Sequence, residues 1–156
     1  MRIGHGYDAH RFCENKLMRL GGVEIDSELG LLAHSDGDVL LHALMDALLG
    51  AAGERDIGYQ FPDNAGEYKD IDSRILLART RDILAGKNLT IEYADMTVVA
   101  QKPKLKPYIE AMRTEIARVL GIDVSRVNVK ATTEEKMGFT GRGEGIAANA
   151  VCLLAE

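Results

Sequence analysis

The chain has 156 residues, with 19 basic and 24 acidic side chains and a formal net charge of −5. A chain of this length can bury roughly 70% of its extended surface, so we expect a single domain over residues 1–156. The acidic balance argues against a broad nucleic-acid or anionic-membrane surface. No apolar run approaches the roughly 18 residues of a membrane span, and Cys13 and Cys152 lack CxxC spacing. These features predict a cytoplasmic protein with no nucleic-acid or membrane partner.

The first third of the chain predicts a strand, a hairpin arm and a helix. Residues 2–11 alternate in the way a short strand does. Residues 18–25 suit a hairpin arm, in which Gly21-Gly22 mark a bulge or a close backbone approach. Leucine and alanine recur at helical spacing over residues 38–52. The start of this helix can be capped by Ser35, Asp36 or Asp38.

The middle of the chain predicts two more helices around a strand. A helix is expected from Ser73, which is a plausible cap, to Ala85, with Gly86 at the stop position. A strand is expected over residues 93–101. Pro107 then suits the start of a helix that ends before Gly121.

Two strands, 127–133 and 146–154, complete the predicted elements. Together they predict an α+β fold, with a mixed sheet of about four main strands plus a small hairpin and three helices packed on one face. The stretches 53–72 and 136–145 are too long for ordinary connections, and loops of this kind often carry function.

All four histidines lie in the first 42 residues, interleaved with aspartates. Imidazole and carboxylate form a ligand set suited to zinc or another divalent first-row metal. Asp8 and His10 are two apart in a strand, so their side chains point to the same face. Alone, this pair is also compatible with exposed polar residues on an edge strand. His42 strengthens the metal hypothesis, because an imidazole among leucines needs a hydrogen bond or a metal, and Asp46 at i+4 could orient it.

Three other segments suit anionic ligands. His34 to Asp38 precede a helix, where free N–H groups favour phosphate, although helix capping alone also explains an aspartate there. The run 130–136, followed by glycines around Arg142, offers hydroxyls, carboxylates and an arginine for a magnesium-chelated diphosphate, but glycine-rich turns more often only reverse the chain. Lysines and prolines at 100–107 either form solvated surface or present a rigid edge and positive charge to a nucleotide.

Five blocks along the chain carry a specific pattern: RIGHGYDAH at 2–10, LAHSDGD at 32–38, DIG with FPD in 56–63, VNVKATT at 127–133 and GFTGRGEG at 138–145. In these blocks the chain resembles the 2-C-methyl-D-erythritol 2,4-cyclodiphosphate synthase family over nearly its whole length. At Glu134 it departs from the third threonine that the family often has, which places a second carboxylate beside Glu135.

The resemblance implies two divalent ions and a set of catalytic residues. Asp8, His10 and His42 would bind one transition metal per subunit, zinc being the expected ion, and Glu135 would hold magnesium or manganese at the substrate diphosphate. His34 and Thr133 would stabilise the transition state.

The resemblance also implies the substrate contacts and a homotrimer with active sites at subunit seams. Substrate-binding residues would include Asp8, His10, His34, Ser35, Asp56, Ile57, Gly58, Phe61, Pro62, Asp63, Phe139 and Arg142. The cytidine of a neighbouring subunit's substrate would contact Ala100, Gln101, Lys102, Pro103, Lys104, Leu105, Lys106, Ala131, Thr132 and Thr133.

The implied reaction cyclises 4-diphosphocytidyl-2-C-methyl-D-erythritol 2-phosphate to 2-C-methyl-D-erythritol 2,4-cyclodiphosphate and releases CMP, a step of the non-mevalonate isoprenoid pathway. Two other classes use similar residues. A metal-dependent phosphohydrolase would activate water with the same ligands, although the His-Asp dipeptide of the best-known enzymes of that kind is absent. A non-enzymatic module that binds CMP or metal is the other alternative.

Overall fold

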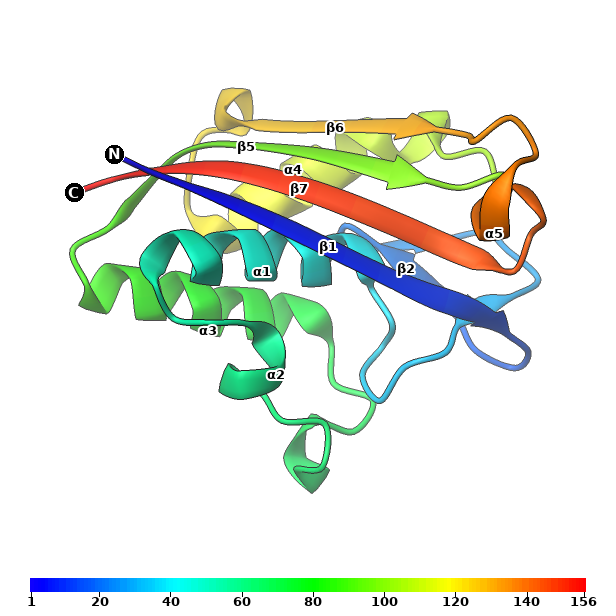
Figure 1. The fold of residues 1–156 in the computed structure, drawn as a ribbon, viewed down its shortest axis with the longest axis horizontal. Helices are drawn as coiled ribbons and strands as arrows, with labels where there is room; N and C mark the ends of the chain where they lie inside the picture. The colour runs from blue at the N-terminus through cyan, green and yellow to red at the C-terminus, as the bar shows by residue number, and fades with distance from the viewer.

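A five-stranded mixed sheet is the framework of the computed structural model, which describes residues 1–156 (Figure 1). The strands are β1 (Arg2–Cys13), β4 (Gly30–Leu31), β5 (Thr90–Val99), β6 (Val127–Thr132) and β7 (Gly145–Ala155), in the order β4-β1-β7-β5-β6. Only β5 and β6 run parallel. A separate hairpin pairs β2 (Met18–Leu20) with β3 (Val23–Ile25). The predicted α+β class and mixed sheet are confirmed, but the main sheet has five strands rather than about four.

Three long helices lie on one side of the sheet, as predicted: α1 (Val39–Ala52), α3 (Ser73–Gly86) and α4 (Ile109–Leu120) (Figure 1). Helix α1 packs on β1 and β7, whereas α3 packs mainly on α1 and α4. Almost every residue of α1 is buried, because the sheet covers one side of it and α3 another. None of the helices has the length and apolar character needed to cross a membrane.

Several predicted element ends were wrong. Asp72, not Ser73, caps α3 by accepting a hydrogen bond from Arg74 N, and α3 continues through Gly86. Pro107 lies in a 3₁₀ turn, Lys106–Tyr108, that precedes α4, although α4 does end before Gly121, as predicted. The strand expected at 93–101 begins earlier, at Thr90.

The two stretches expected to be irregular contain short helical turns. The first, 53–72, holds α2 (Ile57–Gln60) and the 3₁₀ turn Gly66–Tyr68. The second, 136–145, holds α5 (Gly138–Gly141). A third 3₁₀ turn, Val124–Arg126, leads into β6. Single turns of this kind have too few residues to give a hydrophobic period, so the sequence pattern does not indicate them.

Two glycines of β1 allow α1 to lie directly on the strand. A Cβ at Gly4 would fall 1.8 Å from the carbonyl oxygen of Ala47, and one at Gly6 would fall 1.9 Å from that of Ala43. The even-numbered residues of β1 face α1, so the strand brings the following even residues, 8 and 10, towards the same helix. This close approach positions the site described below.

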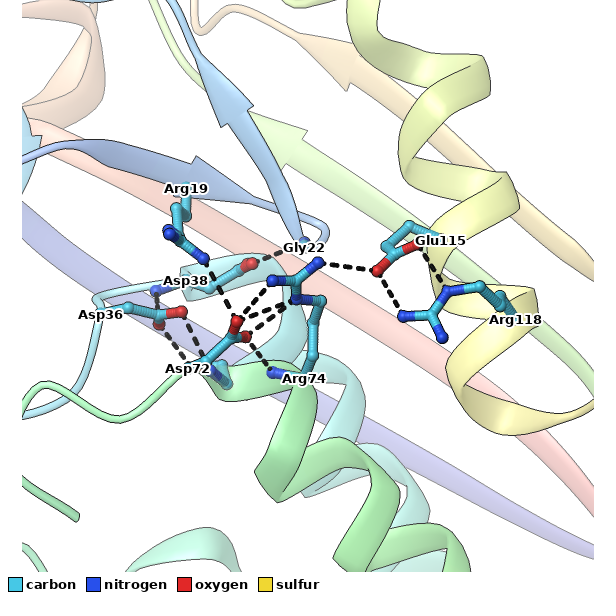
Figure 2. Close-up of polar contacts among 9 residues, drawn as sticks. Arg19, Gly22, Asp36, Asp38, Asp72, Arg74, Glu115 and Arg118 are labelled. Atoms are coloured by element: carbon cyan, nitrogen blue, oxygen red, sulfur yellow. Dashed lines mark hydrogen bonds and ion pairs between the residues drawn. The ribbon is translucent and has the colours of Figure 1, made fainter.

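A polar network ties the start of α3 to its neighbours (Figure 2). Asp72 accepts hydrogen bonds from both Arg74 and Arg19, and Arg74 reaches Glu115 of α4 at 2.9 Å. Arg118, one turn further along α4, donates to the same Glu115 carboxylate at 2.7 Å. Helix α3 is thereby held to both α4 and the β2–β3 hairpin.

Candidate functional site

Asp8, His10 and His42 converge at one point between β1 and α1. His10 Nε2 lies 2.9 Å from Asp8 Oδ2 and 3.0 Å from His42 Nδ1, and that nitrogen is 3.1 Å from the same carboxylate oxygen. The side chain of His42 is only 7% exposed, whereas His10 and Asp8 are 18% and 24% exposed. As predicted, the side chains of Asp8 and His10 point to the same face of β1, and His42 reaches them from α1.

The charges at this point favour an ionised carboxylate. Burial raises the pKa of Asp8, but hydrogen bonds and positive charge from His10 and His42 outweigh burial and hold that pKa below its usual range. Burial lowers the pKa of His42, while the hydrogen bond and charge of Asp8 raise it, with a net upward direction. Asp8 and His42 thus each stabilise the charged form of the other.

The three side chains also fit a divalent transition metal. Ligand atoms about 2.0–2.1 Å from a tetrahedral zinc lie about 3.3 Å from one another. The three donor atoms lie within 4.8 Å of one another and face a common point, and two imidazoles with one carboxylate are a set that zinc accepts. Three protein ligands leave one tetrahedral position for a fourth group.

The far side of His42 is held by two hydroxyls rather than by the predicted Asp46. Ser73 Oγ lies 3.0 Å and Ser35 Oγ 3.2 Å from His42 Nε2. Asp46 instead accepts a hydrogen bond from Ile57 N at 2.8 Å, so its predicted role beside His42 was wrong. Spacing along a helix indicated that the two could be neighbours, but α2 offers Asp46 a backbone donor.

The segment before α1 uses its carboxylates for capping, one of the two alternatives that the sequence left open. Asp38 accepts from the backbone N–H groups of Leu41, Gly21 and Gly22. Burial and the charge of Asp36 raise the pKa of Asp38 to about 6, against the lowering effect of these donors. A buried carboxylate thus already occupies the start of α1. His34 lies aside from it, with Nε2 3.4 Å from Ala65 O.

A pocket of about 210 Å³ opens beside the three converging side chains. It is lined by Asp8, His10, Ala33, His34, Ser35, His42, Ile57, Gly58, Phe61, Asp63, Tyr68 and Leu76. Two predicted residues of the same segment stand next to this lining without forming it. Asp56 caps α2 by accepting from Tyr59 N at 2.8 Å, and Pro62 follows Phe61.

The residues predicted to contact a nucleotide line a second hollow, of about 260 Å³, at the ends of β5 and β6. It is formed by Ala100, Gln101, Pro103, Lys104, Leu105, Lys106, Ala131, Thr132 and Thr133. Lys102 is absent from this lining and, with Arg142, lines a larger depression of about 840 Å³, which Gln101, Pro103 and Lys104 also border. Within one chain neither the second hollow nor Arg142 lines the pocket of Asp8, His10 and His42.

Glu134 and Glu135 differ in what their carboxylates do. Glu134 accepts a hydrogen bond from the buried hydroxyl of Thr140, which ties it to α5. Glu135 is exposed, and its one hydrogen bond with a side chain is donated by its backbone N–H to Thr133 Oγ1, which leaves the carboxylate out of it. Phe139, on α5, is 36% exposed. Of the two neighbouring carboxylates, Glu135 is the one left available for a ligand.

Comparisons with known proteins identify the family of the chain. The YgbB family model matches residues 1–155. The chain belongs to the YgbB family. It is 59% identical over 154 residues to 2-C-methyl-D-erythritol 2,4-cyclodiphosphate synthase of Pseudomonas putida (strain W619), covering 99% of this chain and 98% of that protein. The protein of the same name from Ectopseudomonas mendocina (strain ymp) is 56% identical over 156 residues, 100% of this chain and 99% of its own.

Solved YgbB-like structures share the fold. A Plasmodium falciparum IspF in complex with CDP superposes with a TM-score of 0.85 at 40% identity, covering 98% of this chain and 94% of that one. The bifunctional IspDF of Campylobacter jejuni gives a TM-score of 0.95 at 46% identity over 98% of this chain. This chain spans only 42% of that longer protein.

Sequence reasoning missed several residues of the site. Tyr68 and Leu76 line the pocket although nothing in their local pattern marks them. Lys16 donates to Ser35 O at 2.7 Å and holds the segment that carries His34 and Ser35. Ser73 was noticed only as a helix start. Each of these contacts joins segments far apart in the chain, so local spacing carries no signal for them.

Proposed function

We propose that this YgbB family member is a 2-C-methyl-D-erythritol 2,4-cyclodiphosphate synthase, a phosphorus–oxygen lyase of the non-mevalonate isoprenoid pathway. Its substrate is 4-diphosphocytidyl-2-C-methyl-D-erythritol 2-phosphate. The observation that carries the proposal is the convergence of Asp8, His10 and His42 beside the pocket of His34 and Ser35, in a chain 59% identical to relatives of that name. Both free cysteines suit the cytoplasm, a reducing compartment.

The reaction is an internal displacement. An oxygen of the 2-phosphate bonds to the β-phosphorus, while the bond from that phosphorus to the CMP oxygen breaks and its electron pair leaves with CMP. Because nucleophile and leaving group belong to one molecule, no protein nucleophile is needed. The chain must hold two anionic groups in line, and enforced proximity can supply about 7–11 kcal/mol in favourable systems.

Residues inside the pocket and residues outside it divide this work. His34 and Ser35 donate hydrogen bonds to the phosphates, and Thr133 stabilises charge in the transition state. When bound, a zinc-type ion on Asp8, His10 and His42 and a magnesium or manganese ion on Glu135 neutralise and orient phosphate oxygens. Ile57, Gly58, Phe61 and Asp63, with the neighbouring Asp56 and Pro62, enclose the methylerythritol. Phe139 and Arg142, which do not line this pocket within one chain, complete the enclosure in the assembly.

The nucleotide is assigned to the second hollow. Residues 100–106 and 131–133 offer backbone edges to the cytosine, and Lys104 offers positive charge to the phosphates. CDP in the Plasmodium falciparum complex supports a cytidine nucleotide as the ligand class.

The active unit is proposed to be a homotrimer in which the hollow of one subunit completes the pocket of the next. Two observations support this assembly. The two hollows share no lining residue within one chain. The sheet face turned away from the helices also exposes large apolar side chains, including Ile3 at 75%, Tyr7 at 51% and Val151 at 46%.

Turnover of the purified protein with its substrate tests the proposal. The cyclic diphosphate and CMP are expected, without net hydrolysis. Release of inorganic phosphate would indicate a phosphohydrolase instead, and binding of CMP without any turnover would indicate a non-enzymatic module.

His42→Ala tests the metal centre. It is expected to lower bound zinc and turnover by at least about 100-fold, because it removes the most buried of three ligands. Metal content is measured by atomic emission and folding by circular dichroism. As the control, wild-type protein stripped with a chelator should recover on adding zinc, whereas His42→Ala should not. Full turnover by metal-depleted His42→Ala would contradict the assignment.

A further inference from the structure

Behind the candidate metal centre, Ser73 links His42 to a second carboxylate. Ser73 is the first residue of α3 and is fully buried. Its Oγ lies 3.0 Å from His42 Nε2 on one side and 2.6 Å from Asp36 Oδ1 on the other. The other carboxylate oxygen of Asp36 accepts from Ser73 N at 2.9 Å, so Asp36 grips both the hydroxyl and the backbone of Ser73.

The direction of these hydrogen bonds follows from what each group can donate. A carboxylate only accepts, so the single hydroxyl proton of Ser73 points to Asp36. The oxygen of Ser73 then has only lone pairs to offer His42, and His42 Nε2 must be the N–H donor. Ser35 Oγ, 3.2 Å away, can act as a second acceptor for the same proton. In the neutral ring, which is the form that binds a metal, the opposite nitrogen, Nδ1, then carries the free lone pair.

That lone pair is the one that faces Asp8 and His10. His42 Nδ1 is the nitrogen that lies 3.0 Å from His10 Nε2 and 3.1 Å from Asp8 Oδ2. A ring held in the opposite tautomer would present a proton to this point and could not bind a cation there.

Asp36 is itself fixed by contacts that do not involve the metal centre. Its Oδ1 accepts from Asp38 N at 3.1 Å, and its own N–H donates to Ile71 O at 3.1 Å. Figure 2 shows Asp36 beside Asp38, between the approach to α1 and the start of α3. The Asp36–Ser73 pair therefore locks α3 to the segment that leads into the helix of His42.

We infer that Asp36 and Ser73 are positioning residues which set the tautomer and ring orientation of His42 for metal binding. The inference rests on the proposed function in one respect, that His42 is a metal ligand. Hydrogen bonds behind a ligating histidine orient the ring and raise its basicity, and their loss typically weakens metal binding about 10- to 100-fold.

Zinc affinity of the full chain tests this inference. Ser73→Ala and Asp36→Asn should each weaken zinc binding by about 10- to 100-fold, measured by competition with a chromophoric chelator. Thr80→Val is the matched control, because it removes another fully buried hydroxyl of α3, one bonded only to Leu76 O. This control should bind zinc as the wild type does, and equal weakening by Thr80→Val would overturn the inference.

A spectroscopic measurement separates positioning from general destabilisation. In zinc-loaded wild-type protein, long-range ¹H–¹⁵N correlation should show His42 protonated at Nε2 and metal-bound at Nδ1, with slow exchange of the Nε2 proton. That exchange should quicken in Ser73→Ala. Metal bound through Nε2 in the wild type would overturn the inference even if neither variant folds.

The outcomes also separate this inference from the proposed function. If the wild type turns over substrate and binds zinc, and Ser73→Ala and Asp36→Asn bind zinc as tightly as the wild type, only the positioning role is overturned. A wild-type protein that neither binds zinc nor forms the cyclic product overturns the proposed function, and the positioning role with it.

Discussion

At the scale of a single residue, Lys104 offers a test of nucleotide binding in the second hollow. It lies among the nine residues that line this hollow, and its side chain is exposed. Lys104→Ala should weaken CMP binding about fivefold, because one exposed charge contact with a phosphate contributes about 1 kcal/mol. Isothermal titration with CMP measures the effect, and zinc content should not change.

Lys102→Ala is the matched control for this substitution. The sequence assigned Lys102 to the same nucleotide segment, but Lys102 lines the larger depression beside Arg142 and not the second hollow, whereas Lys104 lines both. The loss in CMP affinity should therefore be smaller than for Lys104→Ala. A CMP affinity unchanged by Lys104→Ala would count against placing the cytidine nucleotide here.

Single residues were predictable where chain geometry alone determines them. The strand period placed Asp8 and His10 on one face, and in the structure His10 Nε2 lies 2.9 Å from Asp8 Oδ2. The helix period also made Asp46 a neighbour of His42, but its carboxylate turned to Ile57 N. Ser73 has no local feature that connects it with Asp36, which lies 37 positions earlier. The period of a strand or helix predicts the direction of a side chain, whereas its hydrogen-bond partners depend on how the elements pack.

At the scale of elements, Gly6 determines how closely β1 and α1 approach. A methyl group there would lie 1.9 Å from Ala43 O, a backbone atom that cannot move away alone. Gly6→Ala should therefore lower the free energy of unfolding by about 3 kcal/mol or more. By pushing the strand off the helix it should also separate Asp8 from His42 and weaken zinc binding.

Gly50→Ala provides the control on α1, the helix that Gly6 of β1 approaches. Nothing lies within 4 Å of a Cβ at Gly50, and alanine favours a helix by about 1 kcal/mol over glycine. This variant should be as stable as the wild type or more stable in urea unfolding. If Gly6→Ala unfolds at the same urea concentration as Gly50→Ala, the close approach is not what holds the two elements together.

The link between α3 and α4 should weaken in acid. Hydrogen bonds and charge from Arg118 and Arg74, opposed by burial, lower the pKa of Glu115 to about 2. A carboxylate whose pKa is lower in the folded chain stabilises it above its unfolded pKa of about 4.5, and this contribution is lost as pH falls towards 2. The side chain is 20% exposed, so screening leaves about 1–2 kcal/mol.

Glu115→Gln isolates this contribution. The variant should be less stable than the wild type by about 1–2 kcal/mol at pH 7, and the difference should shrink by pH 3. Glu110→Gln is the control, since Glu110 pairs with Arg113 on the same helix but is 78% exposed. Urea unfolding at several pH values measures both. A difference between Glu115→Gln and wild type that stays constant from pH 7 to pH 3 would contradict the role of the charge.

The long helices and strands were predicted from the sequence, whereas the shortest elements were not. The patterns of α1, α3, α4 and the long strands were all present in the sequence, and their ends were misplaced only by a few residues. The two-residue β4 and the single-turn α2 and α5 were missed, because they contain less than one hydrophobic period. The missed α2 mattered most for the site, because Ile57 and Gly58 line its pocket.

At the scale of the whole molecule, the helices leave one face of the sheet uncovered. On that face β1 exposes Ile3 and Tyr7, and the adjacent β7 exposes Val151. Apolar side chains gathered on a sheet face favour burial against another subunit. Sequence alternation indicated which residues would point outward, but whether helices would cover that face depended on the assembled fold.

The proposed trimer makes metal binding and turnover separable. All three candidate metal ligands belong to one chain, whereas the nucleotide hollow is proposed to come from a neighbour. Val151→Lys puts a charge into the apolar face and should convert a particle of about three times 17.0 kDa into monomers, measured by light scattering.

The monomers should keep their zinc and lose cyclase turnover, because each would retain the ligands but lack the neighbouring hollow. Ile75→Glu supplies the control, since Ile75 is 48% exposed on α3, on the helical side of the molecule. It should change neither assembly nor turnover. A monomeric Val151→Lys that still forms the cyclic product would mean that one chain completes its own active site, because a residue from a neighbour would then be dispensable.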